Sequence, residues 1–200
     1  MDKASLRTTY LNTRIAMDAA SHALGSARMM ALLQDHLRKH QAHPAHPASA
    51  TFNVGAYWPF RNEPDVLPLL QQLHEQGYVI GLPSVGHPDD AMQFLRWQPG
   101  CAMHKDRFGI ATPICDEIIM PDCLLIPCVA ADRQGYRLGY GAGFYDRTLA
   151  QLHHHSPQPI HTVGLVFDDA LLDQLPHESH DQPLNALVTQ SVLLLLWQTP

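Results

Sequence analysis

Residues 123–146 have the sequence CLLIPCVAADRQGYRLGYGAGFYD, and this stretch decides the fold class. Its first part, 123–130, is apolar throughout, which is typical of a central strand buried on both faces of a sheet. A glycine-rich loop follows, and residues 143–152 are then expected to form a helix. A buried strand, a glycine-rich loop and a helix in this order are typical of α/β proteins with a parallel sheet.

The rest of the chain continues the alternation of helices and strands. Apolar residues at helical spacing predict helices over 4–20 and 25–40, separated at Gly25. Further helices are expected over 64–76, with Pro64 in the first turn and Gly77 at the end, and over 169–175. Strands are expected over 51–57, 78–82, 91–97, 123–130, 160–167 and 186–189, and an exposed loop over 41–49. The chain is therefore predicted to be a three-layer α/β/α protein with a mostly parallel central sheet, built as one domain over 1–200.

Ligands of such sheets bind beyond the carboxyl ends of the strands. This rule points to three segments: residues 58–65, residues 83–89, and the loop that begins at Ala131. The third segment holds glycines at alternate positions, Gly139, Gly141 and Gly143, which suit neither a helix interior nor a strand interior. They suit a loop whose N–H groups approach an anion in front of a helix N-terminus.

Arg137 and Asp146 flank these glycines and strengthen the interpretation as a phosphate site. The guanidinium of Arg137 would offset phosphate charge, and the carboxylate of Asp146 would hold a metal ion. The spacing fits neither a Walker loop nor a dinucleotide-binding fingerprint. A tight structural turn with no ligand remains the alternative explanation of the glycines themselves.

Composition restricts the function classes. The formal net charge is −6 and the chain has no run of Lys and Arg, so nucleic acid is not an expected partner. The N-terminus lacks the apolar core of a signal peptide and the longest apolar run is too short to span a bilayer, so we expect no membrane association and a cytoplasmic location. The cysteines form no Cys-x-x-Cys pair and are expected to be reduced and mostly buried.

The run from Arg137 to Asp146, RLGYGAGFYD, resembles the signature of the 5-formyltetrahydrofolate cyclo-ligases, also called methenyltetrahydrofolate synthetases. Pro127, Asp132 and Gly135 fit the segment that precedes this signature. The N-terminal sequence KASLR over 3–7, with Arg14 seven residues further on, and the sequence HDQPL over 180–184 are similar to two further motifs of the family. The resemblance implies a fold similar to the NagB/RpiA/CoA-transferase-like proteins and an ATP- and Mg²⁺-dependent ring closure of 5-formyltetrahydrofolate.

The resemblance also implies roles for individual residues. Arg137 and Tyr145 would be catalytic, Glu63 would hold the folate, and Asp146 would bind Mg²⁺ together with Asn185. The implied ATP-binding residues are Lys3, Arg7, Arg137, Gly139, Tyr140, Gly141, Ala142, Gly143, Phe144 and Tyr145. The implied substrate-binding residues are Tyr57, Trp58, Glu63, Tyr140, Gly141, Ala142, Gly143 and Phe144, with Phe60 beside the aromatic pair.

Several positions depart from the family pattern, namely Thr112, Cys128, Ala131, Ala142 and Asn185. Asn185 stands where many members have Asp, and an amide oxygen is a neutral ligand. Two alternatives therefore remain at this point: a folate-binding protein of the same fold without turnover, and a sugar-phosphate isomerase or CoA-transferase relative that needs no ATP. We expect a small-molecule substrate and a monomer in each case.

Overall fold

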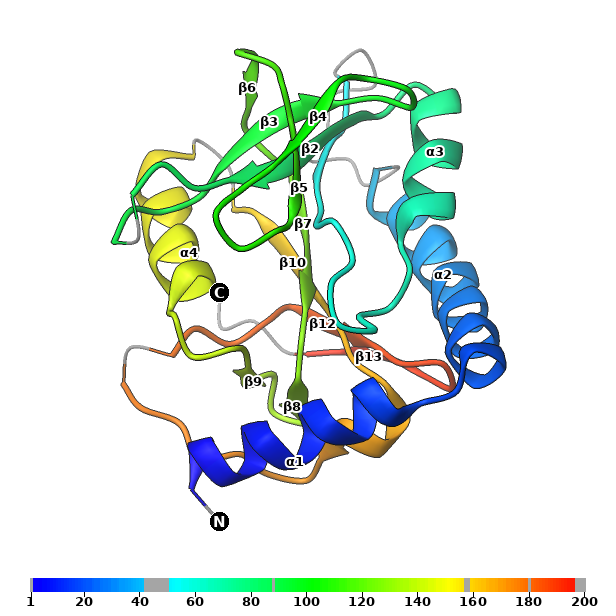
Figure 1. Cartoon of the computed structure of the whole chain (residues 1–200), viewed down its shortest axis with the longest axis vertical. Coiled ribbons are helices and arrows are strands. Elements are labelled where there is room, and N and C mark those ends of the chain that lie inside the picture. The colour runs from blue at the N-terminus through cyan, green and yellow to red at the C-terminus, as the bar shows by residue number, and fades with distance from the viewer. Residues whose placement is uncertain (1, 42–50, 88, 157–158, 180, 197–200) are drawn as a thin grey trace.

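The computed structural model describes residues 2–41, 51–87, 89–156, 159–179 and 181–196 (Figure 1). Its main sheet runs in the order β13-β12-β10-β7-β1-β2-β3-β6. These strands are β1 (Asn53–Gly55), β2 (Val79–Ser84), β3 (Gln93–Trp97), β6 (Ile118–Ile119), β7 (Cys123–Pro127), β10 (His161–Leu165), β12 (Ala186–Val188) and β13 (Leu193–Leu195). The pairs from β12 through β10, β7 and β1 to β2 are parallel, and β13, β3 and β6 pair antiparallel with their neighbours. The predicted mostly parallel sheet is confirmed.

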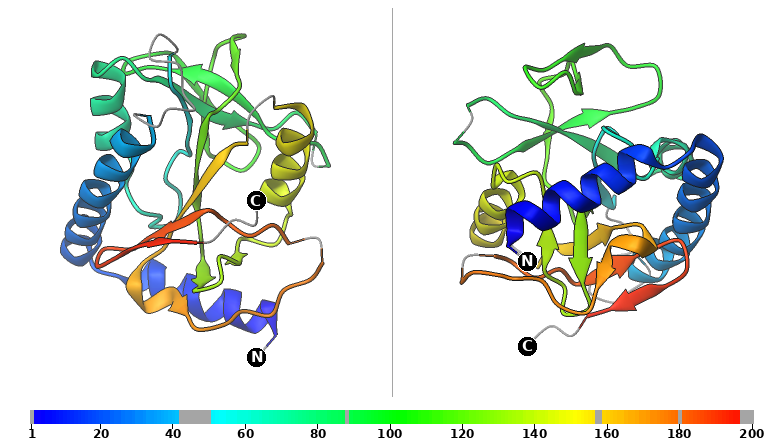
Figure 2. Two further views of the ribbon diagram at one scale, coloured as in Figure 1. Left: turned by 180° about the vertical axis from the view of Figure 1, so that it is seen from behind. Right: turned by 60° about the horizontal axis from the view of Figure 1, so that its bottom comes forward.

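Helices cover both faces of this sheet, as the three-layer prediction requires. Helices α2 (Ala19–Gln41) and α3 (Leu67–Glu75) lie on one face, and α4 (Phe144–His155) lies on the other (Figures 1 and 2). Helix α1 (Lys3–Ala16) crosses one end of the sheet, where Leu6 and Tyr10 pack against the core on the α4 side.

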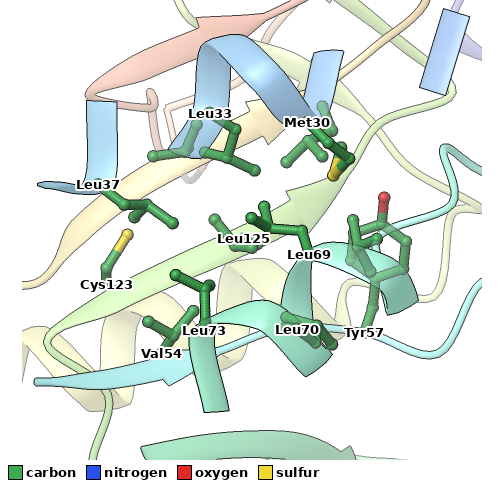
Figure 3. Packing of buried hydrophobic residues seen from close by; sticks show 14 of the residues in the cluster. Met30, Leu33, Leu37, Val54, Tyr57, Leu69, Leu70, Leu73, Cys123 and Leu125 are labelled. Carbon is green, nitrogen blue, oxygen red and sulfur yellow. The ribbon is translucent and has the colours of Figure 1, made fainter. Parts of the chain in front are cut away.

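The larger core lies between α2, α3 and the sheet (Figure 3). Met30, Leu33 and Leu37 of α2 face Leu69 and Leu73 of α3, and side chains of the central strands fill the space below them. This packing explains why the helical apolar spacing in the sequence was informative, because each helix presents one apolar stripe to the sheet.

The two N-terminal helices meet at a different place from the one predicted. Gly25 does not separate them, because α1 ends at Ala16 and α2 begins at Ala19. The Asp18 carboxylate accepts hydrogen bonds from the N–H groups of Ala20 and Ser21, which is a helix cap. Gly25 lies inside α2, where a Cβ would sit 3.1 Å from the ring of Phe167. The glycine therefore allows close packing rather than a break.

Three further boundaries differ from the prediction. Helix α3 has Pro68 rather than Pro64 in its first turn, while Gly77 follows its end with φ 91° as expected. The apolar run 123–130 is divided, since β7 ends at Pro127 and β8 (Ala130–Asp132) belongs to a small sheet with β9 (Arg137–Leu138) and β11 (Leu171–Leu172). The predicted helix over 169–175 is only a 3₁₀ turn, Asp168–Ala170, because the chain continues directly into β11.

Some short strands lie in segments without a clear sequence signal. The hairpin of β4 (Met103–Lys105) and β5 (Ala111–Pro113) was not anticipated, nor were the short strands β6, β9 and β13. The predicted loop over 41–49 lies outside the described residues except for Gln41, which ends α2. All four cysteines are free, and Cys123 and Cys128 are buried while Cys101 and Cys115 are half-buried. None of the helices in the described ranges is long and apolar enough to cross a membrane.

Gly164 shows how tightly the sheet is covered. A Cβ at this position of β10 would lie 2.5 Å from Cδ1 of Leu184 and 2.6 Å from Cδ2 of Leu187. Such overpacking costs about 1–3 kcal/mol. We expect Gly164→Ala to lower the free energy of unfolding by this amount in urea titrations. Gly86→Ala is the control, because the nearest atom would be 3.6 Å away and the site is exposed; equal effects of the two changes would contradict the argument.

Three histidines meet where α2 passes the start of β10. The Nε2 atoms of His36 and His161 are 2.7 Å apart, and the ring of His40 stacks on His161 with centroids 4.0 Å apart. Two nitrogens at this distance share one proton, so at least one of the two rings is neutral. Burial, followed by the charge of Lys39, lowers the pKa of His36 below its ordinary value of 6.5, whereas Asp35 acts in the opposite direction.

This pKa direction predicts a pH dependence of stability. The unfolded chain takes up the His36 proton near pH 6.5, whereas the folded chain takes it up only at lower pH, so stability is full above about pH 6.5 and is lost below it. We expect the free energy of unfolding to fall by up to ~1.4 kcal/mol per pH unit in this window. The measurement compares urea midpoints from pH 7.5 to 5.5. The dependence of stability on pH should become weaker in His36→Gln and should persist in the control His153→Gln, because His153 is exposed. An unchanged slope in His36→Gln would exclude this residue as the cause.

Candidate active site

A cavity of about 530 Å³ opens at the carboxyl ends of β1 and β7. These two strands are neighbours, but the chain leaves β1 toward β2 and leaves β7 toward β10, on the opposite side. The loops that follow the two strands therefore diverge and leave a crevice, which is where open α/β sheets bind ligands. The cavity has the size of an ordinary small-molecule site.

The glycine-rich loop forms one wall of the cavity. Every residue from Arg137 to Asp146 lines it. Gly141 and Gly143 adopt φ values of 95° and 69°, and Gly143 is the N-cap of α4. Among the described residues, no hydrogen-bond acceptor is found for the N–H groups of residues 140–143. The loop thus offers unused backbone donors in front of a helix N-terminus, an arrangement suited to phosphate.

Arg137 and Asp146 form a close ion pair in this wall. Nη2 of Arg137 donates to Oδ1 of Asp146 at 2.6 Å, and Nη1 donates to the carbonyl oxygen of Gln182 at 2.7 Å. The Arg137 side chain is 6% exposed and the Asp146 side chain 31% exposed. The sequence prediction that both residues belong to one site is consistent with this contact, and the pair fixes Arg137 beside the loop.

Helix α1 places two more cations at the cavity. Lys3 Nζ lies 2.6 Å from Oδ2 of Asp181 and 3.2 Å from Oε1 of Glu178. Arg7 Nε donates to the carbonyl oxygen of Gly139 at 2.7 Å. The side chain of Arg7 also lies against Gly141, where a Cβ would be 3.2 Å from its Cζ. The absence of a side chain at Gly141 therefore lets the guanidinium approach the loop.

The lining of the cavity is not cationic overall. It includes four cations and five carboxylates: Lys3, Arg7, Arg61 and Arg137, and Glu63, Asp106, Asp146, Glu178 and Asp181. Lys3 and Arg137 are already paired with carboxylates. A polyphosphate that enters here must replace such pairs, and binding is more favourable when a divalent cation enters with it.

Glu63 lies in the loop after β1 and lines the cavity beside Tyr140 of the glycine loop. It is 3% exposed, and its Oε2 accepts a hydrogen bond from the N–H of Phe60 at 3.0 Å. Its Oε1 accepts a hydrogen bond from the Tyr140 hydroxyl at 3.0 Å and lies 3.9 Å from Nη2 of Arg14. Burial raises the pKa of Glu63 to about 7, although Arg14 and the two hydrogen bonds act in the opposite direction. The carboxyl group therefore titrates near neutral pH, which is common for a functional group in a cleft.

Aromatic rings complete the cavity beside Glu63. Tyr57, Trp58 and Phe60 all line it, as the sequence predicted. Tyr57 is also part of the core, and its hydroxyl donates to the carbonyl oxygen of Pro64 at 2.8 Å, so only its ring is available to a ligand. Tyr140, Phe144 and Tyr145 face the same space from the glycine loop.

Several lining residues were not identified from the sequence. The β4–β5 hairpin contributes Asp106, Phe108 and Ile110, and the ring of Phe108 packs edge-on against Phe144. Arg61 and the two acidic residues near Lys3 were also missed. Glu178 and Asp181 precede no helix or strand, so no periodic pattern marks them in the sequence. Only the HDQPL motif indicated that their segment belongs to the site.

Asn185 is not brought to the cavity. Its Oδ1 accepts hydrogen bonds from the N–H and the Oγ1 of Thr162, at 2.6 and 2.9 Å. This contact joins the amino ends of β10 and β12, whereas the cavity lies at the carboxyl ends of the strands. The expected second metal ligand is therefore corrected: Asn185 is a structural link between two strands.

Asp146 is the carboxylate at the glycine loop that could hold a magnesium ion. Asp146 keeps a partly exposed carboxylate at the glycine loop, and Mg²⁺ is usually held by one or two carboxylates together with phosphates and water. No group of three or more His, Cys, Asp or Glu side chains suited to a metal ion occurs within the described ranges. Asp146 is therefore the residue that would hold a magnesium ion entering with a polyphosphate.

The fold and the cavity define a class: an α/β protein with a crevice at the carboxyl ends of parallel strands, lined by a glycine-rich loop suited to an anion and by aromatic side chains. Residues 1–190 match the model of the 5-formyltetrahydrofolate cyclo-ligase family, and the chain belongs to that family. The resemblance inferred from RLGYGAGFYD is thereby confirmed.

Known proteins support this assignment. The chain is 39% identical to the 5-formyltetrahydrofolate cyclo-ligase of Escherichia coli K12 over 152 residues, which cover 72% of this chain and 81% of that protein. It is 38% identical to the enzyme of the same name from Mycolicibacterium smegmatis, covering 68% of this chain and 72% of that protein. Among solved structures, Aquifex aeolicus 5,10-methenyltetrahydrofolate synthetase superposes with a TM-score of 0.77 at 26% identity, covering 100% of this chain and 95% of that one.

Proposed function

We propose that this protein converts 5-formyltetrahydrofolate and ATP to 5,10-methenyltetrahydrofolate, ADP and phosphate, and that it needs Mg²⁺ to do so. Family membership supports the reaction. The observation that supports it best is the cavity itself, whose lining includes both the glycine loop, with backbone N–H groups that have no acceptor among the described residues, and a buried carboxylate with aromatic neighbours. The proposed location is the cytoplasm.

The reaction closes a ring through an activated formyl group. The formyl oxygen takes the terminal phosphoryl group of ATP and ADP leaves. N10 then attacks the formyl carbon and releases its proton to water, and phosphate departs with the original formyl oxygen. The protein's task is to align two substrates and to offset charge on the phosphoryl group.

Each wall of the cavity is suited to one substrate. Lys3, Arg7 and Arg137 offset phosphate charge, and the N–H groups of the glycine loop hold the phosphate oxygens. Glu63 accepts hydrogen bonds from the pterin ring, and Tyr57, Trp58 and Phe60 pack against its face. Asp146 would hold Mg²⁺, which would further neutralise the triphosphate when bound. Tyr145 borders both substrates.

The test is formation of the methenyl product, followed by its absorbance with purified protein. The signal should require 5-formyltetrahydrofolate, ATP and Mg²⁺ together, and should be lost in Asp146→Ala. Turnover that persists without ATP would contradict the proposed reaction. Binding of 5-formyltetrahydrofolate in calorimetry without any turnover would identify a folate-binding protein that has lost activity.

A further inference from the structure

Arg14 is the most buried cation near the cavity, and it does not itself line it. The residue lies near the end of α1 and is only 4% exposed. Each of the three nitrogens of its guanidinium group contacts another residue. Nε donates to the carbonyl oxygen of Arg61 at 3.1 Å, and Nη1 donates to the carbonyl oxygen of Cys128 at 3.2 Å. Nη2 donates to the hydroxyl of Tyr140 and lies 3.9 Å from Oε1 of Glu63.

These contacts join three segments that are distant in sequence. Arg61 and Glu63 belong to the loop after β1, Cys128 follows β7 directly, and Tyr140 belongs to the glycine loop. A planar guanidinium with fixed donor directions is suited to hold such groups at defined angles. The Tyr140 hydroxyl accepts from Arg14 and donates to Glu63, so the three side chains form a chain of contacts that ends at the carboxylate.

Arg14 shares its helix face with Arg7. The two residues are seven positions apart, which is about two turns of helix, and they contact the adjacent residues Tyr140 and Gly139. Helix α1 therefore holds the glycine loop at two points, one on the phosphate side and one on the Glu63 side.

We propose that Arg14 is a positioning residue of the reaction, which holds the Glu63 carboxyl group and the Tyr140 hydroxyl in the orientation that receives the folate. This inference rests on the proposed function, since it assigns a role to the Glu63 side of that same site. Arg14 touches neither substrate; it acts through Glu63 and Tyr140.

The electrostatic part of this role follows from the surroundings of Glu63. Burial favours the neutral acid, and among the described charges near it Arg14 opposes this most strongly. The other titratable groups facing Glu63 are hydroxyls, a thiol and an imidazole rather than cations: Tyr57, Tyr140, Tyr145, Cys128 and His22, whose Nε2 lies 2.9 Å from the Glu63 carbonyl oxygen. Without Arg14 the pKa of Glu63 is expected to rise further, because the cation that favours its ionised form is gone.

Two variants separate the charge of Arg14 from its geometry. Arg14→Met removes both, whereas Arg14→Lys keeps a cation but loses the fork of donors. In Arg14→Met, we expect the KM for 5-formyltetrahydrofolate to rise roughly 10- to 100-fold with little change in the KM for ATP. The acidic limb of the pH profile of kcat/KM should also move up by about one pH unit or more. In Arg14→Lys, the KM should rise while the acidic limb stays close to its wild-type position. Arg28→Met, on the exposed face of α2, is the control and should behave as wild type.

The outcomes distinguish this proposal from a purely structural role. If Arg14→Met loses activity only because a smaller fraction of it is folded, kcat falls, whereas both KM values and the acidic limb stay unchanged. This result would overturn the proposal. If Arg14→Met does not fold, Arg14→Lys decides, and a wild-type folate KM in that variant overturns the proposal. Calorimetric binding of 5-formyltetrahydrofolate without ATP, from pH 6 to 8.5, gives the same comparison without turnover. A wild-type protein that binds folate but shows no turnover would contradict the proposed function while leaving the Arg14 test intact.

Discussion

Replacing Arg137 with methionine is expected to lower kcat/KM by about 10²- to 10³-fold and to leave the fold intact. Among the described residues, Arg137 is the only cation of the cavity that pairs with a carboxylate of the segment 137–146. Its partner is Asp146. The Arg137 side chain is nearly buried, so its charge is weakly screened by water and acts strongly on a phosphoryl group brought to the loop.

The loss should appear on the ATP side of the reaction. We expect a higher KM for ATP and a lower kcat, while calorimetric binding of 5-formyltetrahydrofolate stays close to wild type. Stability should fall by no more than about 2 kcal/mol, because the released Asp146 carboxylate is partly exposed and can be hydrated.

Arg133→Met is the matched control. Arg133 lies in the turn between β8 and β9, is exposed, and pairs with the exposed Asp173 at 3.4 Å. It should retain wild-type kcat/KM. If the Arg137 variant kept full activity, or if both variants lost it equally, the assignment of Arg137 to the phosphate site would be wrong.

Much of this site could be predicted from sequence because its central segment is local. The glycine spacing, Arg137 and Asp146 occur within one short run, and their contact follows from a loop that turns directly into α4. Lys3, Arg7 and Glu63 came from the family resemblance, since nothing in their local pattern distinguishes them from surface charges. The mostly parallel sheet could likewise be predicted, because each buried strand is an apolar run followed by a helix or loop.

The remainder depends on contacts between distant segments. The sequence placed Arg14 beside the KASLR motif without a role, and its contacts with the segments after β1 and β7 depend on how these meet at the end of α1. The hairpin of β4 and β5 is short and mostly exposed, so it has no apolar pattern that sequence analysis could detect. Asn185 shows the opposite case, since a motif suggested a metal ligand where the fold uses the amide to join two strands.

Replacing Glu63 with glutamine should separate folate recognition from ATP recognition. A buried carboxylate that accepts hydrogen bonds on both oxygens is converted to an amide with one acceptor and one donor group. Hydrogen bonds to a charged group contribute about 1.5–3 kcal/mol, so the KM for 5-formyltetrahydrofolate should rise roughly 10- to 100-fold. The KM for ATP should change little, because Glu63 belongs to the part of the cavity proposed to bind the folate.

The pH profile gives the sharper result. The carboxylate is the form that accepts hydrogen bonds from the pterin, and the pKa of Glu63 is about 7, so wild-type kcat/KM should fall as the pH drops through this value. Glu63→Gln cannot titrate and should lack this acidic limb, in contrast to the shift expected for Arg14→Met. Glu75→Gln, on the exposed surface of α3, should keep the wild-type profile. If the acidic limb persisted in Glu63→Gln, the proton would belong to another group, and the folate side of the site would have to be assigned to the aromatic wall and the glycine loop instead.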